Sequence, residues 1–224
     1  MIRSVAVGAA ASRDVQERLT DLTARVQPTV LAAEQRLPAP APLVPLLPDG
    51  GLRRGTTLVV RGSMSLAMAL VAEASAAGSW LAAANLPELG VAAAAEQGIC
   101  LERFALVPAI PPARWAEVLA ALVDSLDLIL AASPAALDPV QARRLAARVR
   151  ERRAVLVGVG DRWVGPVDLE LSLTTRRWEG PDRGHGHLQA RLAEVTSTGR
   201  GAASHASRVR LWLPDRHGRV ARAE

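Results

Sequence analysis

The side chains that most often carry chemistry in proteins are scarce in this chain of 224 residues. Its 27 cationic side chains are all arginines, and there is no lysine. This excludes a Schiff-base lysine and the lysine that grips nucleotide phosphates in phosphate loops. Cys100 is the only cysteine, so an internal disulfide and a CxxC metal site are excluded as well. We expect no metal site and no cofactor.

Tryptophans and arginines occur together in the C-terminal third, which carries most of the positive charge. Residues 141–224 have a net charge of +8, and residues 1–140 have a net charge of −3. Aromatic rings among cations occur at protein interfaces, where Trp and Arg act as anchors, and on surfaces that stack bases and bind phosphates. We favour a protein interface and keep DNA contact and surface packing as alternatives. The candidate residues are Arg162, Trp163, Arg176, Arg177, Trp178, Arg208, Arg210 and Trp212.

An amphipathic helix is predicted over residues 14–30, within an N-terminal region that spans 1–36. Val15, Leu19, Leu22 and Val26 recur at helical spacing and form one apolar stripe. This stripe is our candidate for docking a partner, helix against groove, or for self-association.

A proline-rich connector over 37–49 follows, in which alternate prolines favour an extended polyproline II spacer. The main domain is expected over 50–213, and a basic C-terminal tail over 214–224.

From residue 50 onward, strand and helix patterns alternate. Strands are predicted at 56–60, 80–84, 104–107, 126–131 and 154–159, and helices at 65–77, 88–97, 113–123 and 138–152. Such alternation predicts an α/β fold with a mostly parallel sheet flanked by helices. Residues 167–177, 188–196 and 208–213 instead alternate apolar and polar side chains, which is typical of antiparallel strands with one wet face.

Residues 50–62, GGLRRGTTLVVRG, resemble the entry to the RecA recombinase core: a GGLxxG turn, the first strand, and the first glycine of the phosphate loop. The likeness continues through Gly78, the strand that ends near Asn85, the strand 126–131 and the late antiparallel strands. It covers residues 45–213 and implies a RecA-like core.

The phosphate loop of that family is degenerate in this sequence. Aligned from the strand, Met68 falls at the lysine position and Ala69 at the magnesium-ligand position; aligned backward from Gly78, the loop is shorter and Ser63 falls at the lysine. The magnesium-binding aspartate is replaced by Ala132, after a strand that ends in alanine. We therefore expect no ATP hydrolysis. The degenerate loop positions are Gly62, Ser63, Ser65, Met68 and Ala69.

A RecA-like chain without this machinery resembles the RecA-like accessory proteins of bacterial mutagenesis cassettes, the ImuA family, and above all its actinobacterial branch. The resemblance implies a cytoplasmic, non-catalytic adaptor in SOS-induced translesion DNA synthesis. Its implied partners are ImuB, an inactive Y-family polymerase homologue, and an error-prone replicative polymerase. Three alternatives remain: a SulA-like inhibitor of cell division, a nucleotide-dependent recombinase, and a plain DNA-binding module.

Overall fold

The computed structural model describes residues 35–134, 137–180, 186–199 and 206–223. The described residues from Leu37 onward form one compact unit. The predicted N-terminal helix, with Val15, Leu19, Leu22 and Val26, lies outside the described residues. No helix in the described part is long and apolar enough to cross a membrane.

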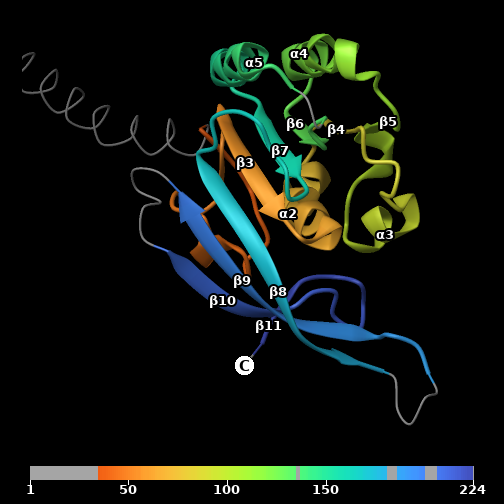
Figure 1. Ribbon diagram of the computed structural model, residues 1–224. Coiled ribbons are helices and arrows are strands. Elements are labelled where there is room, and N and C mark those ends of the chain that lie inside the picture. Colours follow the sequence, from red (N-terminus) through yellow and green to blue (C-terminus); the bar gives the residue numbers. More distant parts are fainter. Residues whose placement is uncertain (1–34, 135–136, 181–185, 200–205, 224) are drawn as a thin grey trace, which may run out of the picture. The chain divides into compact units, whose positions relative to one another are not determined.

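The core of the unit is a mixed sheet of nine strands in the order β11-β10-β9-β8-β3-β7-β6-β4-β5 (Figure 1). The half that the chain builds first, from β3 to β7, is parallel, as the alternating pattern predicts. The central strands β4, β6 and β7 are buried at every position, because helices cover both faces of this half. The parallel strands are β3 (Thr56–Arg61), β4 (Leu81–Ala84), β5 (Phe104–Val107), β6 (Leu128–Ala131), β7 (Val155–Val159) and β8 (Leu169–Glu179).

The second half of the sheet is antiparallel and begins at β8, which pairs in parallel with β3 and antiparallel with β9. Strands β9 (Ala190–Gly199), β10 (Ser207–Trp212) and β11 (Ala221–Arg222) complete it. The protein is therefore α/β with a large, mostly parallel mixed sheet, an architecture compatible with a RecA-like core.

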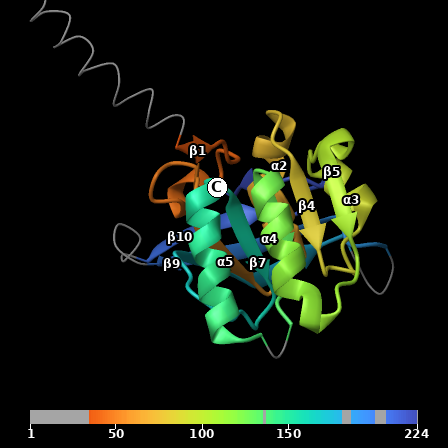
Figure 2. The ribbon, with the colours of Figure 1, turned by 90° about the horizontal axis from the view of Figure 1, so that it is seen from above.

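Two hydrophobic clusters lie on the two faces of the sheet. Helices α2 (Met64–Ala76) and α3 (Val91–Glu96) contribute to the cluster on one face. Helices α4 (Trp115–Ser125) and α5 (Pro139–Arg152) cover the other face, where they lie side by side (Figure 2). Asp138 caps α5 by accepting a hydrogen bond from the Val140 N–H, which explains why this helix begins where the sequence predicts.

Two of the other helices differ from their predicted bounds. The helix expected at 88–97 is shorter and begins after Gly90. The helix expected at 113–123 begins at Trp115, because Pro112 opens a 3-10 turn, η3 (Pro112–Arg114), immediately before it. The remaining 3-10 turn in this region is η2 (Leu101–Arg103).

The proline-rich segment 37–49 is not an extended polyproline II spacer. The strand β1 (Arg36–Leu37) ends at the first residue of this segment, the segment contains the 3-10 turn η1 (Val44–Leu46), and β2 (Leu52–Arg53) follows it. Leu43, Leu46 and Leu47 are buried in the same hydrophobic cluster as α2. These leucines stabilise the packed position of the segment, because the burial of each large apolar side chain contributes about 1.5–3 kcal/mol to the free energy of unfolding.

The predicted tail at 214–224 is also partly integrated into the fold. Residues Ala221–Arg222 form β11, which pairs with Leu211 and Trp212 of β10. The sheet therefore extends beyond the predicted domain boundary at residue 213.

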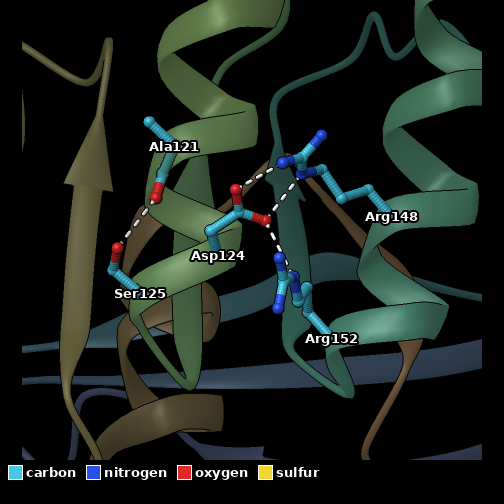
Figure 3. Close-up of polar contacts among 5 residues, drawn as sticks. All are labelled: Ala121, Asp124, Ser125, Arg148 and Arg152. Carbon is cyan, nitrogen blue, oxygen red and sulfur yellow. Dashed lines mark hydrogen bonds and ion pairs between the residues drawn. The ribbon is translucent and has the colours of Figure 1, made fainter.

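An ion-pair cluster joins α4 to α5 on the outer surface (Figure 3). The Asp124 carboxylate accepts hydrogen bonds from Arg148 Nε at 2.6 Å and from Arg152 Nε at 3.1 Å. The hydrogen bond from Arg148 is the largest cause that lowers the pKa of Asp124, followed by the positive charges of Arg148 and Arg152. One carboxylate thus ties two turns of α5 to the end of α4.

We predict that Asp124→Asn lowers the free energy of unfolding at neutral pH. The folded pKa of Asp124 is depressed, so the ion pairs contribute above the unfolded Asp pKa of about 4, and this contribution is lost as the pH falls through the folded pKa. Urea unfolding of the wild type and of Asp124→Asn, measured at a series of pH values from 7 into the acid range, should show that the difference in their free energies of unfolding becomes smaller. Ser125→Ala, which removes only the hydrogen bond to the Ala121 carbonyl, should have an effect independent of pH. A constant difference for Asp124→Asn would contradict this account.

Candidate functional site

The connection at the degenerate phosphate loop is only two residues long. Strand β3 ends at Arg61 and helix α2 begins at Met64, which leaves Gly62 and Ser63 between them. Gly62 has a positive φ of 71°, and the Ser63 hydroxyl caps α2 by accepting from the Leu66 N–H at 3.1 Å. A connection of two residues agrees with the shorter of the two sequence alignments, in which Ser63 falls at the lysine position. A phosphate loop needs a longer run of free backbone N–H groups between strand and helix to surround a phosphate.

The other positions of the phosphate machinery have structural roles in this chain. Met68 and Ala69 lie in α2 and are buried in the hydrophobic cluster beneath it. Ala132 follows β6, and its carbonyl accepts hydrogen bonds from Trp115 Nε1 at 2.9 Å and Asn85 Nδ2 at 3.4 Å. In the longer alignment the lysine and magnesium-ligand positions are thus packing residues, and in the shorter one the lysine position is Ser63, which caps α2. The aspartate position, Ala132, supplies a hydrogen-bonded carbonyl.

A guanidinium group from β9 lies against the Gly62–Ser63 turn. Arg191 Nη2 donates to Ser65 Oγ at 2.6 Å and to Ser63 Oγ at 3.1 Å, and the two hydroxyls are 3.0 Å apart. On its other edge, Arg191 Nε donates to the Leu213 carbonyl at 2.6 Å. Arg191 therefore joins the first strand–helix turn to the end of β10.

Among the described residues, no carboxylate forms an ion pair with the Arg191 guanidinium. The side chain is 9% exposed, and burial lowers its pKa. The Trp178 ring, whose centroid lies 5.3 Å from the guanidinium carbon, supplies a cation–π contact. Since an arginine remains protonated in proteins, a permanent positive charge lies beside the two serines.

Sequence reasoning missed Arg191. It is 128 positions from Ser63, so no local spacing connects them. The one available signal was the period-two pattern of residues 188–196, which places Arg191 on the same face as the buried Ala193 and Val195.

The predicted arginines gather on the outer face of the antiparallel half-sheet. The β9–β10 register sets Arg210 opposite Glu194 and Trp212 opposite Leu192, and Arg177 lies opposite Leu192 from the other side. The same face of the sheet continues across β3 to β7 and β6, where α4 and α5 cover it. We call the following set the arginine face: Arg61, Arg176, Arg177, Arg208, Arg210 and Trp212.

One carboxylate organises the centre of the arginine face. Glu194, whose side chain is 8% exposed, pairs with Arg176 at 2.9 Å, Arg208 at 3.2 Å and Arg210 at 3.8 Å. The hydrogen bond from Arg176 is the largest cause that lowers the pKa of Glu194, and the charges of all three arginines add to it. At the edge of the face, Arg61 forms a bidentate ion pair with Glu170, in which Nε and Nη2 each donate to one carboxylate oxygen.

The predicted tryptophans do not share one surface. Trp212 lies on the arginine face with the Arg177 guanidinium 5.6 Å from its ring centroid, whereas Trp178 lies on the opposite face beside Arg191. Trp163 packs edge-on against Trp115 at 6.0 Å and covers Gly158, which favours the packing alternative for this residue. Arg162 is exposed in the loop after β7.

These features define a protein with a RecA-compatible α/β sheet, a shortened strand–helix turn held by a buried arginine, and an arginine-rich sheet face. Comparison with known sequences shows which protein family the chain belongs to. The profile described as MT3502 N-terminal domain matches residues 45–165, and the chain belongs to this family. The chain is also 31% identical over 165 residues to the uncharacterized protein Rv3395c of Mycobacterium tuberculosis, a match that covers 69% of this chain and 80% of the relative.

We predict that Arg191 and Ser65 are energetically coupled. In a double-mutant cycle, Arg191→Met and Ser65→Ala should show a coupling of about 1–3 kcal/mol in the free energy of unfolding, because each removes the same charge-assisted hydrogen bond. The control pair is Arg191→Met with Ser75→Ala, a buried serine that bonds to the Cys100 N–H instead and should be additive. Additivity of Arg191 with Ser65 would show that the contact contributes nothing.

We further predict that Gly158→Ala destabilises the protein by about 1–3 kcal/mol, the usual cost of overpacking a core. A Cβ atom at this position would lie 2.4 Å from the Trp163 ring. Chemical denaturation should report the loss, with Gly90→Ala as the control, since a Cβ there would meet its nearest neighbour, Ala93, at an ordinary 3.7 Å. An equal effect of the two substitutions would mean that Trp163 moves aside without cost.

Proposed function

We propose that this protein is a non-catalytic RecA-fold adaptor of damage-induced translesion DNA synthesis. In this proposal it corresponds to the actinobacterial branch of the ImuA family and binds an inactive, ImuB-like Y-family polymerase homologue. The observation that carries the proposal is the short Gly62–Ser63 turn, at which the Arg191 guanidinium donates hydrogen bonds to the hydroxyls of Ser63 and of Ser65 in the first turn of α2. The sheet is compatible with that of a nucleotide-driven, RecA-like protein. At the turn where such a protein would bind phosphate, Ser63 and the following Ser65 accept hydrogen bonds from Arg191.

The physical argument against nucleotide hydrolysis has three parts. The turn is too short to place several backbone N–H groups around a phosphate. In neither alignment is the lysine position a cation: it is the buried Met68 or the helix-capping Ser63, and the aspartate position offers only the hydrogen-bonded carbonyl of Ala132. The Ser63 and Ser65 hydroxyls already bond to Arg191. A protein built in this way acts by binding other macromolecules, which in the translesion setting are the polymerase homologue and an error-prone replicative polymerase.

The partner is proposed to dock on the apolar stripe Val15, Leu19, Leu22 and Val26, which the sequence predicts and which lies outside the described residues. Helix-in-groove docking requires the apolar side chains of such a stripe to be buried by the partner. A charged side chain placed within the stripe would have to be desolvated on binding, at a cost of several kcal/mol.

The experiment combines partner binding with nucleotide binding on the full chain. We expect the purified polymerase homologue to bind the wild-type protein equally well with and without ATP and Mg²⁺. Leu19→Asp/Leu22→Asp should weaken this binding at least about 100-fold, the equivalent of 2.7 kcal/mol. The control variant Thr20→Asp/Ala24→Asp adds the same charge off the stripe and should bind normally.

Three outcomes would overturn the proposal. Absence of binding to the polymerase homologue removes the adaptor role. Equal binding by the stripe variant and its control removes the helix from the interface. Tight, magnesium-dependent ATP binding by calorimetry would show that the turn still accepts a nucleotide and that the active recombinase alternative is correct.

A further inference from the structure

We infer that the arginine face is a binding surface for single-stranded nucleic acid. It carries more positive charge than its own carboxylates neutralise. Glu170 pairs with Arg61 and Glu179 pairs with Arg177, but Glu194 alone faces three guanidinium groups. The side chains of Arg208 and Arg210 are 67% and 70% exposed, so their remaining N–H donors point to solvent. Phosphate oxygens are the acceptors that such exposed guanidinium forks bind most strongly.

Glu194 also holds these arginines in position before any ligand arrives. A free surface arginine loses rotamer entropy when it binds, at a cost of about 0.5–1.5 kcal/mol for each side chain. Here Arg176, Arg208 and Arg210 converge on one carboxylate that is nearly buried on β9. Arg208 and Arg210 project from the same face of β10, two residues apart, which spaces them about 6.8 Å along the strand. The result is an ordered row of donors that follows the strand direction.

The aromatic part of the face distinguishes a single strand from other polyanions. The Arg177 guanidinium lies over the Trp212 ring, so the pair offers flat surfaces on which an unpaired base stacks. In a duplex the bases are already stacked on one another and do not reach a flat sheet. An acidic peptide supplies negative charge without planar groups for Trp212. The combination of a cation row and a stacking platform therefore fits a single strand best.

This inference stands independently of the proposed adaptor role. The residues involved lie on β3, β8, β9 and β10, and none belongs to the N-terminal stripe or to the Gly62–Ser63 turn. A failure to bind nucleic acid would therefore not contradict the proposed polymerase partner. A failure to bind that partner would not contradict the nucleic-acid surface.

The test is fluorescence anisotropy of a labelled oligothymidylate with the full chain. We expect Arg208→Ala/Arg210→Ala to weaken binding at least about tenfold and to reduce the slope of log K against log salt by about 1.4, since each phosphate contact to a single strand contributes about 0.7. Arg176 remains to pair with Glu194 in this variant. Trp212→Leu should weaken binding by about 5- to 150-fold through lost stacking while leaving the salt slope unchanged.

The matched control is Arg143→Ala/Arg144→Ala, which removes the same charge from two exposed positions on α5, outside the arginine face. It should bind as the wild type does. The Tm of each variant should lie well above the assay temperature, so that a loss of binding does not reflect unfolding. Absence of wild-type binding would overturn the inference. So would equal weakening by the control pair, or displacement of the oligonucleotide by poly-glutamate or duplex DNA as readily as by unlabelled single strand.

Discussion

The hydrogen bonds of Arg191 are the contact on which the rest of this structure depends. One guanidinium group bonds on one edge to the hydroxyls at the start of α2 and on the other to the carbonyl at the end of β10. It therefore connects the parallel α/β half, which the chain builds first, to the antiparallel half, which it builds last. A buried cation without a carboxylate partner costs free energy, and hydrogen bonds to several neutral acceptors offset that cost. The serines that form this contact lie at the Gly62–Ser63 turn and in the first turn of α2.

Much of the α/β core could be predicted from the sequence, because its signals are local. The run Phe104–Val107 and the helix capped by Asp138 appear where expected, since β-strand composition and helix caps act within a few residues. The segment 37–49 was misjudged because proline spacing describes backbone preference but not where the intervening leucines are buried. The strand β11 was missed because two residues of pairing leave no periodic pattern.

The candidate site was predicted less completely, for two physical reasons. Arg191 acts through contacts made across the whole chain, which no spacing rule detects. The arginine face depends on an irregularity in β8, where the pairing register shifts between Thr175 and Arg177. Strict alternation would point consecutive side chains to opposite faces; the bulge lets Arg176 reach Glu194 while Arg177 stacks on Trp212 on the same face. Four arginines of this face, Arg176, Arg177, Arg208 and Arg210, are candidates that the sequence offers, whereas Arg61 is not and Arg162 lies off the face. Their common face, and the separation of Trp178 from it, follow only from the strand register.

Strand β8 has a consequence for how the two halves respond to a bound molecule. It runs for 11 residues, is hydrogen-bonded to β3 near its start, and carries Arg176 and Arg177 near its end. Its Glu170 also holds Arg61, the last residue before Gly62. A molecule bound at the outer end of β8 therefore contacts the same continuous strand whose Glu170 and Leu173 lie beside Arg61 and Gly62, just before α2. The two ends are joined by the backbone of β8 across the bulge at Thr175–Arg177, by its ladder to β3 and by the Arg61–Glu170 ion pair.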